Sequence, residues 1–129
     1  MAEAGAIIEA VDRDDAGEVG RLLEMNPSLL EARDEQGETA LIRAAHGYSD
    51  GTEVVRLLLD RGADVNAVGE GFRNTALMWA AAFGHIEKVL LLLSRGADAS
   101  LRDSYGRNAL VSASEGCTRA NRSDDYLPV

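Results

Sequence analysis

Small groups of apolar and polar residues recur along the chain at a nearly constant interval. Thr39-Ala40-Leu41 returns 36 positions later as Thr75-Ala76-Leu77 and 33 positions after that as Asn108-Ala109-Leu110. Arg61-Gly62-Ala63-Asp64 returns 34 positions later as Arg95-Gly96-Ala97-Asp98. A period of about 33 residues is typical of stacked units that are each too small to bury their own apolar face. The pattern therefore predicts an all-α repeat solenoid.

Each unit is predicted to hold two short helices and a turn. In the best-defined unit, a short apolar helix begins near Thr75 and is broken at Gly84-His85. A second helix follows and ends at Gly96, with its apolar residues at Ile86, Val89, Leu90, Leu92 and Leu93. Gly62 and Gly96 stand where a helix needs a left-handed residue just after its end. We expect Asn26-Pro27 to end a helix in the same way, with Asn26 left-handed.

Helix starts carry a matching signal. Asp15 and Asp50 each precede a glutamate by three positions, at Glu18 and Glu53. This is the spacing in which the two side chains cap each other's backbone N–H groups. We therefore expect Asp15 and Asp50 to be N-caps, and the nearby Asp12 and Asp14 to belong to a solvated helix end.

These segments resemble the ankyrin repeat. The resemblance is carried by Gly37–Ala45, Glu53–Ala67, Thr75–His85 and Arg95–Asp98, whose order and spacing agree across two units. It implies stacked helix-turn-helix repeats with β-turn loops on one side and a role in binding other proteins. On this basis we divide the chain into an ankyrin repeat domain at 1–117 and a tail at 118–129. The domain comprises a degenerate N-terminal repeat at 4–33, repeats at 34–67 and 68–102, and a C-terminal half repeat at 103–117.

The chain departs from the family pattern in three respects. The usual proline after the helix-start threonine is replaced by Ala40, Ala76 and Ala109. The segments 46–52 and 68–73 are longer than their family counterparts, and insertions of this kind fall on loops. After residue 117 no leucine stripe continues, so the last unit is either a polar cap or an uncovered end that pairs with another chain.

Composition narrows the class of function. The chain has 129 residues, 46% of them hydrophobic, and a formal net charge of −9. A charge of that sign disfavours a nucleic-acid-binding surface and favours a basic partner. The sequence contains no apolar run of membrane-spanning length and no visible secretory signal. A single cysteine, Cys117, cannot form an internal disulfide. We therefore expect a cytoplasmic protein with neither a membrane nor a nucleic acid as partner.

Candidate chemistry is sparse. His46 and His85 belong to no metal-spaced cluster, and no nucleophilic triad or phosphate-binding loop is evident. The resemblance makes His85 a structural turn residue, whereas we expect His46 to be exposed in the loop between two helices. We predict no catalytic residue, no cofactor and no metal, and hence no enzyme.

The family resemblance places partner contacts on loop tips and first helices. They fall on Glu35, Gln36, Glu38, His46, Tyr48, Phe72, Arg73, Asn74, Phe83, Ser104, Tyr105 and Arg107. Phe72 and Tyr105 occupy the same loop position 33 residues apart, and exposed aromatics beside arginine are typical binding hot spots. Alternatively, each ring lies flat on its own loop. Arg43 and Trp79 also match each other, and we expect Arg43 to reach past the core to water or to stack on Trp79.

Two functions follow as hypotheses. The first is a non-enzymatic protein-interaction module, monomeric, that binds a partner through its concave loop and first-helix face. The alternative is a homo-oligomeric scaffold that uses the incompletely capped C-terminal end.

Overall fold

The computed structural model describes residues 2–47 and 52–110, and the structural statements below concern those residues. They form helices, turns and one isolated antiparallel bridge between Arg33 and Thr39, and no extended strand. The α-helices are α1 (Ala2–Asp12), α2 (Ala16–Met25), α3 (Ala40–Ala45), α4 (Glu53–Asp60), α5 (Ala76–Ala82) and α6 (Ile86–Ser94), and a 3₁₀ helix, η1, covers Pro27–Glu31. The predicted all-α repeat solenoid is confirmed.

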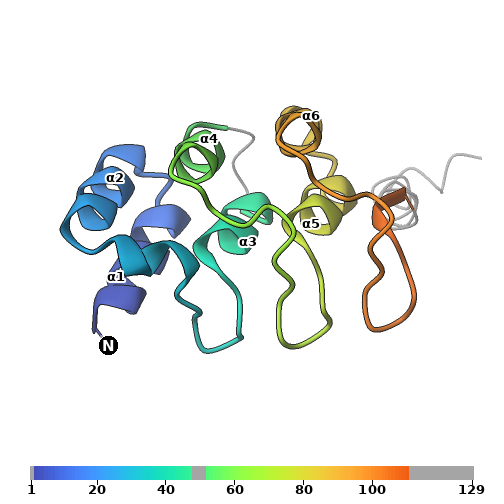
Figure 1. Cartoon of the computed structure of the whole chain (residues 1–129), viewed down its shortest axis with the longest axis horizontal. Helices are drawn as coiled ribbons and strands as arrows, with labels where there is room; N and C mark the ends of the chain where they lie inside the picture. Colours follow the sequence, from blue (N-terminus) through green and yellow to red (C-terminus); the bar gives the residue numbers. More distant parts are fainter. Residues whose placement is uncertain (1, 48–51, 111–129) are drawn as a thin grey trace, which may run out of the picture.

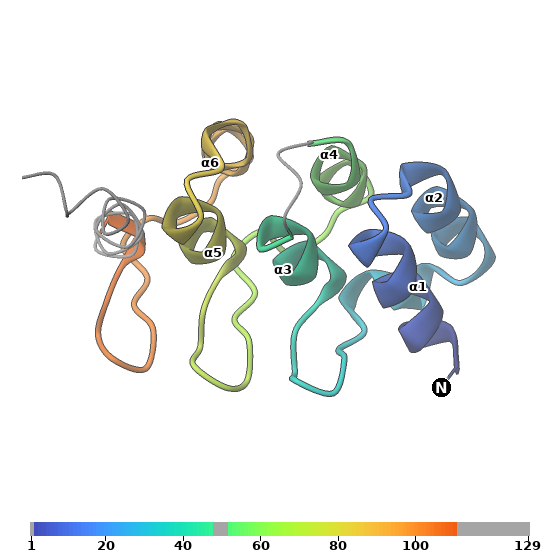
Figure 2. The ribbon, with the colours of Figure 1, turned by 180° about the vertical axis from the view of Figure 1, so that it is seen from behind.

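The helices stack as pairs along one axis. The first helices pack on one another, α1 on α3 and α3 on α5, and among the second helices α2 packs on α4. In both views the second helices form one layer, the first helices the next, and long loops project from the opposite side (Figures 1 and 2). The loops therefore form a row beside α3 and α5.

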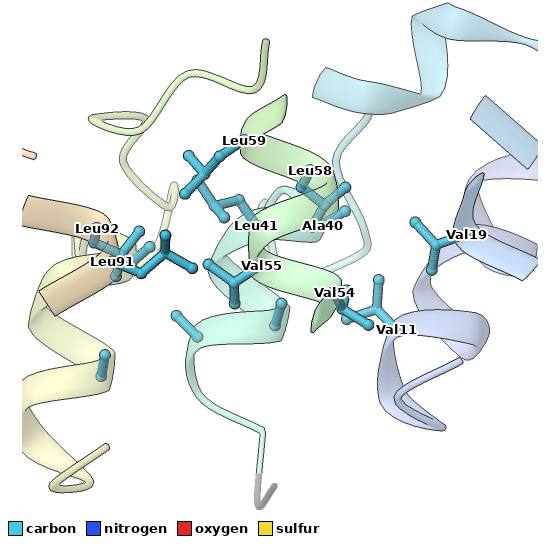
Figure 3. Close-up of a cluster of buried hydrophobic side chains, with 14 of the residues drawn as sticks. Val11, Val19, Ala40, Leu41, Val54, Val55, Leu58, Leu59, Leu91 and Leu92 are labelled. Carbon is cyan, nitrogen blue, oxygen red and sulfur yellow. The ribbon is translucent and has the colours of Figure 1, made fainter. Parts of the chain in front are cut away.

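The core runs through the stack as one cluster of buried apolar side chains (Figure 3). Leu58 of α4 and Leu92 of α6 are fully buried, as is Ala45 of α3. On α6, by contrast, Ile86, Leu90 and Leu93 remain exposed although the sequence assigned them to the same apolar helix. Residues spaced by four and three positions lie on one helical face, so α6 has one buried and one exposed apolar face.

The helix ends largely follow the predicted signals. Gly62 and Gly96 both have φ of +94° and follow the ends of α4 and α6, as expected of left-handed residues there. Thr75 caps α5 by accepting a hydrogen bond from the Met78 N–H at 3.3 Å, and Gly84 has φ of +72° in the turn after that helix. The two helices of each unit therefore begin and end where the capping threonine and the glycines in the sequence predict.

The predicted capping boxes need correction. Asp15 caps α2 by accepting from the Glu18 N–H at 3.1 Å, but the Glu18 carboxylate pairs with Arg21 at 2.6 Å instead of returning to Asp15. Helix α4 begins at Glu53 with Thr52 in the N-cap position and without a side-chain cap, whereas Asp50 lies outside the described residues. An arginine one turn away competes better for Glu18 than a neutral backbone N–H.

The expectation of a left-handed Asn26 is wrong. Asn26 has φ of −147°, and its side-chain oxygen accepts from the Ser28 N–H at 3.3 Å. It ends α2 and at the same time starts η1, with Pro27 in the first turn, where a proline needs no N–H partner. The chain therefore changes direction through a second short helix and not through a left-handed residue.

Candidate functional site

The candidate site is the row of loops together with the helices beside it. We call this surface the loop face and define it as residues 33–38, 68–74 and 102–107 with the partly buried side of α3 and α5 and their C-terminal cap residues His46 and Phe83. The three loops project to the same side of the stack (Figure 1). Backbone hydrogen bonds join them in series, from the Glu70 N–H to the Gly37 carbonyl at 3.2 Å and from the Ser104 N–H to the Phe72 carbonyl at 2.8 Å. The three loops are therefore hydrogen-bonded to one another in a row.

The first and third loops are closed by an aspartate in the same way. Oδ1 of Asp34 accepts from the N–H groups of Gln36 and Glu38, both at 2.9 Å. Oδ1 of Asp103 accepts from those of Tyr105 and Arg107, also both at 2.9 Å. Burial of Asp103 by itself raises the pKa of its carboxyl, but these two hydrogen bonds and the Arg107 guanidinium outweigh burial and leave the pKa lowered.

The middle loop lacks this aspartate and adopts a strained backbone. Glu70 stands at the position corresponding to Asp34, and the loop is closed by a backbone bond from the Gly69 N–H to the Asn74 carbonyl at 2.9 Å. Arg73 has φ of +59°, where the neighbouring loops have Gly37 at +75° and Gly106 at +78°. A side chain in the left-handed region costs about 1–2 kcal/mol relative to the right-handed one.

Phe72 and Tyr105 meet across the second and third loops. Their ring centroids are 5.8 Å apart in a stacked arrangement, and the residues remain 56% and 67% exposed. The Arg107 guanidinium lies over the Tyr105 ring at 5.0 Å and also binds Asp103 through Nε at 3.0 Å. Phe72 and Tyr105 therefore lie at equivalent positions of neighbouring loops, as the repeat spacing predicted. Their rings stack on each other, so the alternative in which each ring lies flat on its own loop is wrong.

A second group of rings runs along α5. The centroids of the His46 and Trp79 rings are 4.8 Å apart. The Trp79 ring stacks on the Phe83 ring with a centroid distance of 5.8 Å, and the centroids of the Phe83 and His85 rings are 6.0 Å apart. His46 is half-buried at the end of α3 with Nε2 only 2.9 Å from Oε1 of Glu38, so the prediction of an exposed loop histidine is wrong. His85 is buried and its Nε2 is 2.8 Å from the Gly47 carbonyl, which matches the expected turn role.

Arg43 does not stack on Trp79, contrary to one of our expectations. Its Nη2 binds both carboxylate oxygens of Asp12, at 2.7 and 2.9 Å, and Asp34 and Glu38 lie within 4 Å of its other nitrogens. Partial burial by itself lowers the pKa of Arg43, but the hydrogen bond to Asp12 and the three acidic charges raise it overall. The guanidinium stays where carboxylates attract it, and His46 takes the position against the Trp79 ring.

The other predicted contact residues are distributed along this face. Glu35, Gln36 and Ser104 are exposed, as are Phe83 and Arg73, whereas Glu38 and Asn74 are partly buried. Tyr48 lies outside the described residues. Sequence reasoning missed Asp34 and Asp103, which shape two of the loops. Their signal was available, since an aspartate two and four positions before turn residues is a common loop-closing pattern.

Among residues 2–47 and 52–110, no group of three or more His, Cys, Asp or Glu side chains is arranged to hold a metal ion. No helix in the same ranges is long and apolar enough to cross a membrane.

Comparison with known proteins assigns the family. A family model described as ankyrin repeats (3 copies) matches residues 53–121. The chain is 32% identical over 90 residues to the palmitoyltransferase Hip14 of Drosophila melanogaster, covering 70% of this chain and 14% of that protein. It is 44% identical over 94 residues to the ankyrin repeat and KH domain-containing protein mask of the same fly, covering 72% of this chain and 2% of that protein. The serine/threonine-protein kinase VIK of Arabidopsis thaliana is 36% identical over 109 residues, or 84% of this chain and 23% of the kinase.

The chain therefore spans less than a quarter of each of these three relatives. The match covers only a limited region of each protein, so the activities in their names describe those proteins and not this chain. Ankyrin repeats generally act as protein–protein interaction modules and are typically non-catalytic. On the evidence of its helix pairs, its loops and these matches, the chain belongs to the ankyrin-repeat family.

Proposed function

We propose that this chain is a non-enzymatic module that binds another protein through its loop face. The observation that carries the proposal is the pair of exposed, stacked aromatic rings of Phe72 and Tyr105 on neighbouring loops. Aromatic side chains bury a large area with little loss of conformational entropy, and together with arginine they dominate binding hot spots. Rings held against each other and by Arg107 are already ordered before a partner arrives, which lowers the entropic cost of binding.

The strained backbone at Arg73 supports the same surface. The two neighbouring loops meet the need for a positive φ with glycine, whereas the middle loop keeps an exposed arginine at the equivalent position, next to Phe72. Strain of this kind concentrates at binding and catalytic sites, where a side chain is kept despite its cost to stability. An arginine at this position makes the positive φ less favourable than a glycine would. We therefore infer that the Arg73 side chain is present because it contacts the partner and not because it stabilises the loop.

The contact surface that we propose comprises Glu35, Gln36, Glu38, His46, Tyr48, Phe72, Arg73, Asn74, Phe83, Ser104, Tyr105 and Arg107. The net charge of −9 favours a partner with a basic surface and an association that weakens as salt is added. We further propose a monomer that works in the cytoplasm, with the repeat boundaries given above and neither membrane nor nucleic acid as partner.

The test compares two double variants of the full chain. Phe72→Ala with Tyr105→Ala removes the aromatic pair, and Ile86→Ala with Leu90→Ala removes exposed apolar side chains from α6, away from the loop face. Proteins that bind the wild type are captured, identified by mass spectrometry and titrated individually with each purified variant. We expect the first variant to bind at least about tenfold more weakly with its melting temperature little changed, and the control to bind like the wild type. Equal binding by both variants would contradict the proposal.

A self-assembling scaffold that uses the incompletely capped C-terminal end is the second candidate. Residues 111–129 of that end lie outside the described residues, and the exposed face of α6, the last described second helix, favours this candidate. Ile86 is 69% exposed, Leu90 58% and Leu93 44%, and their spacing places them on one helical face. Exposed apolar faces of this kind often mark interfaces. Light scattering at increasing protein concentration separates the two functions. In this experiment Ile86→Ala with Leu90→Ala is the test variant, and Phe72→Ala with Tyr105→Ala is the control. Growth in mass that Ile86→Ala with Leu90→Ala abolishes would favour the scaffold, and a constant monomer mass would exclude it.

A further inference from the structure

The net charge of the protein and the charge beside the aromatic pair differ in sign. Residues 1–47 contain eleven acidic and four basic residues, whereas residues 52–110 contain seven of each. The third loop, 102–107, has two arginines and one aspartate, and Arg73 follows Phe72 in the second loop. A partner segment seated on the aromatic pair therefore meets a different local charge from a segment that lies on the N-terminal end of the stack.

The acidic side chains of the second and third loops do not offset the positive charge beside the rings. Asp103 is buried, and its carboxylate accepts from the backbone N–H groups of Tyr105 and Arg107 and from Nε of Arg107 at 3.0 Å. Glu70 lies against the first loop, since a Cβ added at Gly37 would come within 2.6 Å of its Oε1. Asp103 thus balances Arg107, and the Glu70 carboxylate lies on the first-loop side of the second loop.

Arg73 and Arg102 have no acidic partner of their own among residues 2–47 and 52–110. Nη1 of Arg102 donates to the Gly106 carbonyl at 2.7 Å, which places this guanidinium beside the residue that follows Tyr105. Arg73 is exposed and directly follows Phe72. In the same ranges, five other arginines do have a carboxylate oxygen within 4 Å, namely Arg21, Arg43, Arg61, Arg95 and Arg107. Two guanidinium groups that can pair with a carboxylate therefore flank the aromatic pair.

The acid-rich end of the stack is too distant to reverse this local charge in physiological salt. Packed helices lie about 8–10 Å apart, so the third loop lies roughly 16–20 Å along the stack from the first. At an ionic strength of about 0.15 M the Debye length is about 8 Å, and charges separated by more than that are largely screened. A charged side chain seated at Tyr105 therefore responds to Arg102 and not to the carboxylates of the first loop.

We propose that the aromatic pair takes a short partner segment in which an aspartate or glutamate stands next to an apolar or aromatic residue. The apolar side chain packs on the exposed rings of Phe72 and Tyr105, and the carboxylate accepts hydrogen bonds from Arg73 or Arg102. A lysine or arginine at the same place would meet a charge of its own sign. This inference rests on the proposed function and adds the chemistry of the segment at the rings, while the basic surface of the partner faces the acid-rich residues 1–47.

The experiment selects random peptides, displayed on phage, against the full chain in about 0.15 M salt. Peptides of about twelve residues are long enough, at about 3.3 Å per residue, to cross both loops. We expect the enriched peptides to share an acidic residue beside an apolar or aromatic one. Synthetic copies are then titrated against Arg73→Gln and Arg102→Gln. The matched control is Arg56→Gln, which removes the same charge from an exposed position on α4, outside the loop face.

Charge reversal separates a direct contact from a structural role. Arg102 also holds the Gly106 carbonyl, so a loss of binding by Arg102→Gln alone could reflect a changed loop. Peptides whose acidic residue is replaced by lysine should bind the wild type at least about tenfold more weakly and regain affinity on Arg73→Glu or Arg102→Glu. A loop that is merely disturbed would not come to prefer the lysine peptide.

Arg73→Gln and Arg102→Gln should each weaken binding of the acidic peptides by about three- to tenfold, whereas Arg56→Gln should have no effect. Enriched peptides that lack an acidic residue and still depend on Phe72 and Tyr105 would overturn this inference and leave the proposed function standing. So would acidic peptides that bind both glutamine variants like the control, or lysine peptides that regain affinity on neither glutamate variant. Peptides that bind Phe72→Ala with Tyr105→Ala like the wild type, or a selection that enriches no peptide, would count against both.

Discussion

Truncation of Leu58 tests whether the stack is held by burial between neighbouring units. This side chain of α4 is fully buried within the cluster that joins successive helix pairs (Figure 3). Leu58→Ala removes buried methyl and methylene groups and leaves a void in a central unit, where packing from both sides limits collapse. Substitutions of this kind cost about 2–5 kcal/mol, and the complete burial of Leu58 places it in the upper half of that range.

The matched control is Leu90→Ala, the same chemical change on the exposed face of α6. Leu90 is 58% exposed, so its truncation should change the free energy of unfolding by no more than about 0.5 kcal/mol. For a domain of this size, 1 kcal/mol corresponds to roughly 3–5 °C in melting temperature. Leu58→Ala should therefore melt about 10 °C or more below Leu90→Ala.

Urea unfolding followed by circular dichroism measures both variants. The slope of the free energy against urea concentration must be compared as well, because a repeat array can lose cooperativity when a central unit is weakened. A smaller slope for Leu58→Ala would mean that the units separate, and the midpoint would then understate the loss. Equal melting of Leu58→Ala and Leu90→Ala, with equal slopes, would refute the reasoning that leucine burial between units stabilises the fold.

Three further predictions concern turns and caps. Thr75→Ala should cost about 1–2 kcal/mol in urea unfolding, because it leaves the buried start of α5 without its cap, and an unchanged midpoint would contradict this. Arg73→Gly should raise the free energy of unfolding by up to about 1 kcal/mol while weakening partner binding, since glycine relieves the positive φ, and a loss of stability would show that Arg73 is not strained. Asp103→Asn should lower stability near neutral pH. Because the folded pKa of Asp103 is lowered from 3.8, its contribution is present above that pH and lost as the pH falls through the folded pKa, so the variant and the wild type should converge in acid. A difference that persists at pH values well below 3.8 would refute this.

The helices and their ends could be predicted because their causes are local. Apolar spacing and a glycine just after Ser94 and Arg95 are enough to indicate where α6 ends, since glycine alone adopts φ of +94° without strain. The matching of Phe72 with Tyr105 followed from the repeat interval itself. A repeat places equivalent positions of adjacent units side by side, so the sequence contained the information for this contact.

The failures arose where a local rule competed with a distant partner. Arg43 was expected to seek water or Trp79, but Asp12, 31 residues earlier, lies close enough to bind it. His46 was assigned to an exposed loop because nothing nearby in the sequence suggests a contact with Trp79. Both errors concern side chains whose position depends on a residue of a neighbouring unit. For Arg43 that residue is Asp12 of the degenerate first unit, which shows the repeat pattern least clearly.

Lys88 makes a polar contact that aligns two neighbouring units. A lysine in the middle of α6 would ordinarily face water, yet it is 2% exposed and its Nζ donates to the Ala44 carbonyl of α3 at 2.8 Å. Helix α3 ends at Ala45, so this carbonyl has no partner within its own helix, and a cation suits that end of the helix dipole. Asn66 makes a comparable link between loops, accepting from the Asp98 N–H at 2.7 Å.

These polar bonds explain why the apolar faces stack in one register. Leucine and alanine surfaces alone tolerate sliding, because burial is non-directional. A shift of one unit against the next would break the hydrogen bond from the buried Lys88 ammonium to the Ala44 carbonyl, and a hydrogen bond to a charged group contributes about 1.5–3 kcal/mol. The apolar repeats thus supply most of the stability, while a few buried polar bonds between units fix the alignment. The same alignment places Phe72 against Tyr105 and keeps the loop face continuous.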